Sequence, residues 1–472
     1  MGTRDRLNDL LARVRADPDD VGRYELAWAA ARAEAADAAR EWAANTGDEL
    51  AGLIAAAAEG VEDDSLEQAR RLARIGGLLK PTEDLGADEE QRLLRARFRE
   101  FADRVVRPRA AAIHRQQLPI PDEIIEGAAG LGLFNLSSTD FRTMLIATEE
   151  LSAASLNAAG SLITRPEILV HALLRAGTDE QKARWLPDIT NGRKMVAVAV
   201  TEPGAGSDVA ALGDCLATRA EAGWLLDGRK RWAGFSARAE LIAILVRTRE
   251  GAGHRGLSLF VIEKPRLDQR DFEHHQEAGG LLRGTAIPIL GYRGMNTYDL
   301  QFERYLVPEQ NLIGGPAWLD RGFYLQMEAF SVGRLQTAGR SVGVMQAALD
   351  AARAYAAQRV VFGSRVADLQ LAQASLGGMA VAVNSARQLS YRAARLMDQG
   401  TGQVQASLAK LFAARMAERV TRDAMQVHGG NGYSEESDVS RYFVDARALT
   451  IFEGAEEVLA LRVIAKALLE EI

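Results

Sequence analysis

Residues 195–232 read MVAVAVTEPGAGSDVAALGDCLATRAEAGWLLDGRKRW, and this stretch decides the expected fold. Apolar and β-branched residues dominate 195–201, which predicts a strand that ends at a glycine-rich turn. Residues 215–223 and 224–232 predict two further strands, with Asp227-Gly228 as a hairpin signal. Because no helical pattern separates these strands, we expect an antiparallel sheet rather than βαβ units.

Outward from this stretch, strand patterns continue to about residue 307, and helical patterns lie on both sides. The further expected strands are 239–248, 257–264, 285–290 and 297–307. Helices are expected over 88–113 and about 121–132 before the sheet, and over about 321–357, 367–398, 402–428 and 453–469 after it. Four long helices of this kind can form a bundle of antiparallel neighbours.

The expected fold class is therefore α+β, in four segments. They are a helical N-terminal extension (1–85), an N-terminal α-domain (86–194), a middle β-domain (195–315) and a C-terminal helical bundle (316–472). The extension shows short helical patterns at 3–15, 21–45, 47–59 and 64–79. It carries no constellation of catalytic residues, so we expect it to pack on the main body or on a neighbouring subunit.

Composition excludes several classes of function. With 472 residues, 47% hydrophobic composition and a formal net charge of −7, the chain can bury several cores but lacks the basic balance typical of nucleic-acid binding. Its one cysteine, Cys215, allows neither an intramolecular disulfide nor a cysteine-rich metal site. His274-His275 has no third ligand nearby and indicates an exposed loop rather than a metal site.

No run of about eighteen apolar residues or secretory signal is evident, so we expect a cytoplasmic protein without membrane insertion.

Three short motifs can carry chemistry. The glycine-rich turn at 200–208 exposes backbone N–H groups that can bind a polar ring edge or a phosphate, although a plain β-turn explains it equally well. The segment QVHGGNGY at 426–433 suits either a helix end or a close ligand approach. Glu453 lies among apolar residues in TIFEG, just before a helix. Burial there favours a general base, while a helix cap or dipole partner is the alternative.

In their order and spacing, these motifs resemble the acyl-CoA dehydrogenase family from about residue 88 to the C-terminus. Further matching segments are EEQRLLRARFREFADRVVRP, GTDEQKARWLP, GRLQTAGRSVGVMQAALDAARAYAAQRVVFG and YFVDARALTIFEGAEEVL. The resemblance implies a helical N-terminal domain, an antiparallel β-domain and a four-helix bundle that hold FAD and an acyl-CoA substrate. It also implies a homo-oligomer, a tetramer or a dimer, and an electron-transfer flavoprotein as electron acceptor.

The resemblance also implies roles for individual residues. Glu453 falls on the catalytic base, which removes the α-proton of the thioester while FAD accepts the β-hydride. An α-C–H group is a weak acid, so hydrogen bonds to the thioester carbonyl must stabilise the developing enolate. The implied FAD contacts are Val200, Thr201, Gly206, Ser207, Trp232, Arg359, Phe362, Gln370, Gln426, Gly429 and Gly430, with Arg359 and Phe362 reaching the FAD of a neighbouring subunit. Arg334 and Gly454 fall on substrate contacts, and no metal is implied.

Within the family, the chain is most similar to methylsuccinyl-CoA dehydrogenase-like members. The likeness lies in the helical extension, the insertion before Leu290, the string GYRGM at 291–295 and SLITR at 161–165. A dicarboxylic acyl-CoA brings a free carboxylate that needs a cation, and Arg165 is the candidate. The alternative is an ion pair of Arg165 with Glu167 or another carboxylate. Another short branched or dicarboxylic acyl-CoA, or an acyl-carrier thioester, remains an alternative substrate.

The chain departs from the family at three places. Gly234 stands where a hydroxyl usually follows the tryptophan by two residues, Val361 replaces a polar FAD contact, and the 135–142 loop is short. Gly234 can open space beside the flavin, which keeps a flavin oxidase or monooxygenase of the same fold as an alternative function. Val361 implies altered FAD affinity or flavin potential, and the short loop implies a reshaped acyl pocket. A non-catalytic binding protein is the second alternative, against which the carboxylate at Glu453 and the acidic net charge argue.

Overall fold

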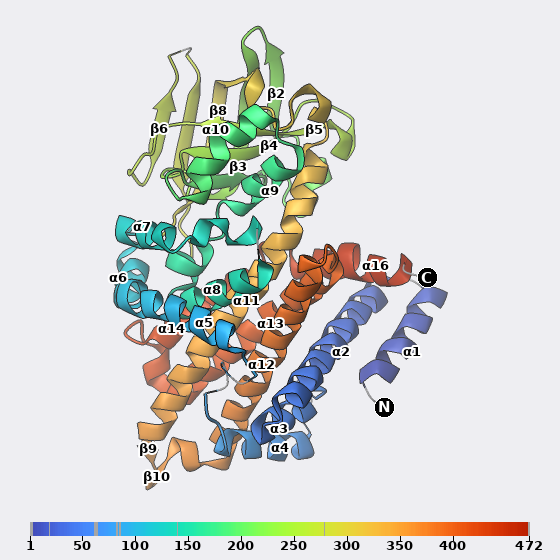
Figure 1. Cartoon of the computed structure of the whole chain (residues 1–472), viewed down its shortest axis with the longest axis vertical. Coiled ribbons are helices and arrows are strands. Elements are labelled where there is room, and N and C mark those ends of the chain that lie inside the picture. Colours follow the sequence, from blue (N-terminus) through green and yellow to red (C-terminus); the bar gives the residue numbers. More distant parts are fainter. Residues whose placement is uncertain are drawn as a thin grey trace. The chain divides into compact units, whose positions relative to one another are not determined.

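The computed structural model describes residues 3–17, 19–60, 65–81, 84, 86–138, 140–277 and 279–470. The chain forms two compact units (Figure 1). Unit 1 comprises Met1–Gln116, Asp140–Gly160 and Arg334–Ile472, and unit 2 comprises Gln117–Thr139 and Ser161–Gly333. The boundaries of the four segments expected from the sequence stay a prediction.

Unit 1 is helical, and the four helices expected in the extension are all present. Its α-helices are α1 Thr3–Ala16, α2 Asp20–Thr46, α3 Glu49–Ala58, α4 Leu66–Gly77, α5 Glu89–Phe101, α6 Arg107–Gln116, α8 Phe141–Ala154, the larger part of α11 Gly322–Gln358, α12 Gln370–Asp398, α13 Gln403–His428, α14 Asp438–Ala446, α15 Glu456–Val458 and α16 Ala465–Glu470. Single π-helical turns at Ala102–Val106 and Leu459–Ile464 interrupt the expected helices at 88–113 and 453–469. A short hairpin, β9 Val360–Val361 and β10 Ser364–Arg365, follows α11.

The N-terminal extension packs on the helices of the bundle. Helix α2 lies against α12 and α13, and α4 lies against α12 (Figure 1). Glycines make the α4–α12 crossing close, since a Cβ at Gly377 would lie 1.9 Å from the Leu72 carbonyl oxygen. A Cβ at Gly76 would lie 1.9 Å from the Gln373 carbonyl oxygen. The extension is therefore an integral part of unit 1.

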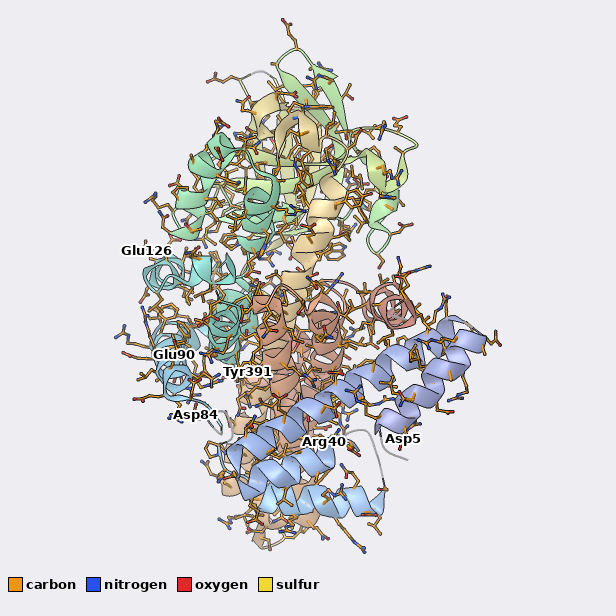
Figure 2. The ribbon with its side chains drawn as sticks, turned by 45° about the vertical axis from the view of Figure 1, so that its right-hand side comes forward. Asp5, Arg40, Asp84, Glu90, Glu126 and Tyr391 are labelled. Carbon is orange, nitrogen blue, oxygen red and sulfur yellow. The ribbon has the colours of Figure 1, made fainter. Side chains whose placement is uncertain are left out.

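A buried charge cluster ties α5, α8 and α12 together within unit 1. Glu149 accepts hydrogen bonds from Arg387 Nε (2.9 Å), Arg95 Nη1 (3.0 Å) and the hydroxyl of Tyr391 (3.1 Å), which Figure 2 labels. Burial by itself would raise the pKa of Glu149, but Arg387 and Arg95 outweigh burial and lower it to about 2. The carboxylate is thus ionised and anchors three helices.

Unit 2 combines helices with a mixed sheet. Its elements are α7 Asp122–Gly130, α9 Glu167–Ala176, α10 Asp179–Thr190, β1 Val196–Ala199, β2 Cys215–Ala220, β3 Gly223–Gly234, β4 Leu241–Arg247, β5 Leu257–Glu263, β6 Phe272–His275, β7 Leu281–Ala286, β8 Thr297–Pro308 and the start of α11. The strand order is β1-β4-β2-β3-β8-β7-β6, with β5 on the other edge of β4. All seven residues of β4 are buried, and the first six are apolar, as expected for a strand covered on both faces.

The α+β fold class is confirmed, and the sheet differs in detail from the expectation. Strands β1 and β2 pair with β4 in parallel, because the β2–β3 hairpin carries the chain back before β4 begins; the remaining pairs are antiparallel. The hairpin signal at Asp227-Gly228 was wrong: this dipeptide lies within β3 at a register shift, where Gly228 has φ 125°. The expected strand at 285–290 is β7, displaced toward the N-terminus.

His274-His275 was expected in an exposed loop, and this expectation was also wrong. Both residues belong to β6, a strand that the sequence pattern did not indicate. His274 Nδ1 lies 3.0 Å from the hydroxyl of Tyr305, and β6 pairs with β7 through its backbone. Across the described ranges, no helix is long and apolar enough to cross a bilayer.

Candidate functional site

In unit 2, the segment that follows β1 is joined to the end of β3. The backbone N–H of Arg231 donates to the Thr201 carbonyl oxygen (2.8 Å). Lys230 Nζ donates to the Val200 carbonyl oxygen (3.0 Å) and to Glu202 Oε1 (2.6 Å), and both charged side chains are fully buried. This pair holds the first glycine-rich turn in a fixed position beside the strand that carries Trp232.

Glu202 also organises the chain on the far side of the turn. Its carboxylate accepts hydrogen bonds from the backbone N–H groups of Gly213 (2.6 Å), Asp214 (2.6 Å) and Cys215 (3.2 Å). With Lys230, it makes four contacts that compensate for burial of its charge. Local sequence patterns offer no signal for this pair, since Glu202 and Lys230 lie 28 residues apart.

Trp232 and the turn residues form an open surface in unit 2. The Trp232 side chain is 53% exposed, with φ 64° at the register shift between Lys230 and Ala233, and the Arg231 guanidinium lies 5.1 Å from its ring centroid. Gly206 and Ser207 are exposed, and the hydroxyls of Thr201 and Ser207 form no hydrogen bond with other described residues. An aromatic face and unpaired hydroxyls suit a flat, polar-edged ring system such as the isoalloxazine of FAD.

The turn is also a β-turn, as the alternative interpretation expected. Glu202 and Ala205 exchange backbone hydrogen bonds of 2.9 and 3.2 Å, and only a short 3₁₀ helix, Val209–Ala211, follows. A Cβ at Gly206 would meet only Thr201 Cγ2, at 3.5 Å. The two interpretations are therefore compatible, because the turn leaves its backbone accessible.

Arg165 lies in unit 2 between Ser161 and α9, and it is half-buried. Its Nε donates to the Ser161 carbonyl oxygen (3.4 Å), and Arg165 forms no ion pair with a carboxylate among the described residues. A Cβ at Gly234 would lie 3.2 Å from Arg165 Nη1. The guanidinium therefore passes close to the backbone two residues after Trp232, where only glycine leaves it full room.

In unit 1, Glu453 lies in a strained loop between α14 and α15. It has φ 54° without being glycine, and Gly454 follows with φ 98°. Its side chain is half-buried, and Oε2 is buried without a hydrogen-bond partner among the described residues. Lys410 Nζ donates to the Gly454 carbonyl oxygen (2.7 Å) and so fixes the loop from helix α13.

Lys410 and Arg334 both lie close to this loop. Burial lowers the pKa of Lys410 to about 8, although Glu453 and Glu456 act in the opposite direction. Burial likewise lowers the pKa of Arg334, and Glu453 opposes that shift. Arg334 Nη1 lies 3.4 Å from Ser407 Oγ, while its buried Nε has no partner in the described ranges. A carboxylate and a guanidinium with incomplete hydrogen bonding are typical of a ligand site.

The remaining residues implied for FAD lie on exposed parts of unit 1. Phe362 is fully exposed at the tip of the β9–β10 hairpin with φ 52°, and Arg359 and Gln370 are exposed on either side of it. Gln426, in the last turn of α13, and Gly429 and Gly430, directly after this helix, are all exposed. A Cβ at either glycine would meet nothing within 4 Å.

Tyr355, near the end of α11, connects these two exposed parts. His428 stacks on its ring with a centroid distance of 4.4 Å, and Asn431 Nδ2 donates to its hydroxyl (3.1 Å). The backbone carbonyl oxygen of Tyr355 accepts a hydrogen bond from the backbone N–H of Arg359 (2.9 Å). The structure thus joins the loop after α13 to the base of the hairpin that carries Phe362.

One cationic pocket of unit 2 was missed by reasoning from sequence. It is open, has a volume of about 440 Å³, and is lined by Arg249, Arg255, Leu319, Asp320, Arg321 and Tyr324. Arg249 Nε lies 3.1 Å from Asp320 Oδ2, the one carboxylate among the lining residues. Guanidinium groups bind phosphate oxygens well. No local motif predicts the pocket, because it joins the β4–β5 connection to the start of α11.

Comparison with known proteins matches most of the chain. Family models for the N-terminal, middle and C-terminal domains of acyl-CoA dehydrogenase match residues 88–193, 197–305 and 320–469. The (2S)-methylsuccinyl-CoA dehydrogenase of Cereibacter sphaeroides is 39% identical over 82% of this chain and 70% of its own length. The caffeyl-CoA reductase-Etf complex subunit CarC of Acetobacterium woodii is 32% identical over 78% of this chain and 96% of its own.

The solved structure of butyryl-CoA dehydrogenase from Megasphaera elsdenii has a similar fold. It superposes with a TM-score of 0.74 at 27% identity, covering 81% of this chain and 99% of that chain. Helices α1 to α4 precede residue 88 and lie outside the three matched family models.

Proposed function

The chain belongs to the acyl-CoA dehydrogenase family of FAD-dependent oxidoreductases, and we propose that its substrate is a short branched acyl-CoA with a second, free carboxylate. Arg165 carries this proposal. It is a half-buried cation without a carboxylate partner in the described ranges, and it passes the backbone at Gly234, next to Trp232 in sequence. Methylsuccinyl-CoA, after which the relative from Cereibacter sphaeroides is named, carries such a free carboxylate.

Glu453 is the proposed base that removes the α-proton. Its Oε2 has no hydrogen-bond partner among the described residues and can accept a proton. Its backbone N–H, which forms no hydrogen bond in the described part of the chain, is the proposed donor to the thioester carbonyl. Lys410 holds the carbonyl of Gly454, so the backbone around the base stays fixed while the proton moves.

FAD, when bound, supplies the acceptor for the β-hydride. The exposed ring of Trp232 and the turn residues Val200, Thr201, Gly206 and Ser207 are its proposed contacts in unit 2. Arg359, Phe362, Gln370, Gln426, Gly429 and Gly430 are the proposed contacts in unit 1. Phe362 is fully exposed at the hairpin tip and so is accessible to a second copy of the chain, the contact that the family resemblance implies for it.

The phosphates of CoA are proposed to bind in the pocket of Arg249, Arg255 and Arg321. Arg334, which the family resemblance places near the CoA nucleotide, and Gly454 stay proposed substrate contacts. An electron-transfer flavoprotein is the proposed electron acceptor, supported by the relative whose name places it in an Etf complex. A homo-oligomer is proposed on the same family grounds.

The test mixes the FAD-loaded protein anaerobically with methylsuccinyl-CoA, butyryl-CoA and dihydrocaffeyl-CoA and follows flavin bleaching. We expect the fastest bleaching with methylsuccinyl-CoA. Arg165→Met should lower kcat/KM for that substrate by about 10–100-fold, as expected for loss of a charged hydrogen bond, and leave butyryl-CoA nearly unchanged. Arg175→Met, which removes an exposed arginine paired with Glu328, is the matched control.

Two outcomes would contradict the proposed substrate class. Equal losses of kcat/KM for both substrates in Arg165→Met would show that Arg165 does not bind the substrate carboxylate. Faster bleaching of the unaltered protein with butyryl-CoA or dihydrocaffeyl-CoA would show that the substrate is not a dicarboxylic acyl-CoA.

The reaction itself is tested separately. Glu453→Gln should slow bleaching by about 10²–10⁴-fold, the usual contribution of a general base. Oxygen added to the reduced enzyme separates the reactions, since rapid peroxide release or substrate hydroxylation would favour the oxidase or monooxygenase alternative.

A further inference from the structure

Helix α2 of the N-terminal extension contacts the segment that carries the proposed base. The Tyr24 hydroxyl donates to Glu456 Oε1 and accepts a hydrogen bond from Arg415 Nη2 (2.6 Å). Arg415, on α13, also forms an ion pair with Glu456. Residues 432 positions apart in sequence are thereby joined within unit 1.

The contact is partly shielded from solvent, with the Arg415 side chain 37% exposed. The Glu456 side chain is 12% exposed, and the Arg415 guanidinium lies 4.0 Å from the ring centroid of Trp28, a buried residue one turn after Tyr24 on α2. Burial raises the pKa of Tyr24, and the hydrogen bond to Glu456 raises it further, so the phenol stays protonated as a donor. A partly buried network of three side chains holds its members more firmly than a fully exposed ion pair does.

Glu456 begins α15, three residues after Glu453. The two residues at the start of this short connection, Glu453 and Gly454, both have positive φ. A non-glycine residue keeps such a conformation only where surrounding contacts hold it. Lys410 holds the carbonyl of Gly454, and Tyr24 with Arg415 holds the side chain of Glu456.

We infer that α2 of the extension is a positioning element for the base loop, with Tyr24 and Trp28 acting on Glu453 through Arg415 and Glu456. This inference rests on the proposed role of Glu453 as the base. It assigns a task to a part of the chain that precedes all three matched family models. Tyr24 is a positioning residue, since it acts through Glu456.

The test compares Tyr24→Phe with Glu41→Gln in the full-length, FAD-loaded protein. Glu41 is on the same helix and pairs with Arg395 of α12 (3.2 Å), but it lies about 25 Å farther along α2. In Tyr24→Phe, flavin bleaching at saturating methylsuccinyl-CoA should be about three- to tenfold slower, because small displacements of a catalytic group are costly. Substrate affinity and the thermal midpoint should stay unchanged.

Two readouts separate positioning from general stability. The kinetic isotope effect with α-deuterated substrate should rise in Tyr24→Phe, because proton removal becomes more rate-limiting. Backbone hydrogen–deuterium exchange of a peptide covering residues 450–458 should also become faster in Tyr24→Phe and stay unchanged in Glu41→Gln. This exchange measurement needs no turnover and therefore decides the inference even if Glu453 is not the base.

The results have distinct meanings. Unchanged exchange at 450–458 in Tyr24→Phe overturns the positioning inference, and so does equal acceleration in Glu41→Gln. Absence of bleaching in the unaltered protein with every acyl-CoA overturns the proposed function instead. Faster exchange together with slower bleaching in Tyr24→Phe alone supports the inference.

Discussion

Replacing Lys230 by methionine should destabilise unit 2 strongly. The Lys230 and Glu202 side chains are both 0% exposed, with Nζ and Oε1 2.6 Å apart. Methionine keeps most of the volume of lysine but removes the charge and both hydrogen bonds. Glu202 then remains buried as an uncompensated anion, and the carbonyl of Val200 loses its partner.

The expected magnitude follows from this geometry. Breaking one side of a buried ion pair costs about 3–5 kcal/mol of unfolding free energy. The lower end is expected here, about 3 kcal/mol, because three backbone N–H groups still donate to Glu202. For a unit of this size, about 2–4 °C of thermal midpoint per kcal/mol gives a fall of about 6–12 °C.

The assay is urea and thermal unfolding, with FAD content of the purified protein as a second measure. Arg283→Met is the control, because the Arg283–Glu273 pair is exposed and its loss should cost less than about 1 kcal/mol. Adding Glu202→Gln to Lys230→Met should recover about 1–2 kcal/mol, since the amide carries no charge while its oxygen still accepts from backbone N–H groups. A loss no larger than the control, or a further loss in the double variant, would refute the buried-charge explanation.

Three more predictions concern other parts of the molecule. Burial raises the pKa of Cys215 to about 12, so a thiol reagent at neutral pH should label it only after unfolding, and rapid labelling of the native protein would contradict this. Burial lowers the pKa of Lys410 from 10.5 to about 8, so its ionised form opposes folding below pH 8. The free energy of unfolding, measured in urea and compared with that of Lys410→Met, should therefore rise by about 3 kcal/mol between pH 8 and 10.5. A difference between the two proteins that does not change with pH would disprove the lowered pKa. Gly377→Ala should expose α4 to limited proteolysis, because its Cβ would lie 1.9 Å from the Leu72 carbonyl oxygen, whereas Gly378→Ala, with 3.7 Å to Leu72 Cδ1, should resist like the unaltered protein.

Local pattern was enough to predict most elements of the fold. The helices of the extension and the bundle, and most strands, follow from apolar periodicity, because side-chain spacing along a helix or strand is a property of neighbouring residues. Resemblance to the family in ordered motifs indicated FAD, and it singled out Glu453 as the proposed base. Asp227-Gly228 shows the limit of such reasoning, since the same dipeptide suits a hairpin and a bulge.

Tertiary structure alone decided which distant residues meet. The buried Lys230–Glu202 pair, the passage of Arg165 beside Gly234 and the network of Tyr24 with Glu456 each join segments far apart in the chain. The sequence by itself determined the periods of the elements and the residue types available for chemistry. It could not determine these meetings, because they depend on how helices and strands pack and on where the backbone adopts positive φ, neither of which is encoded by neighbouring residues.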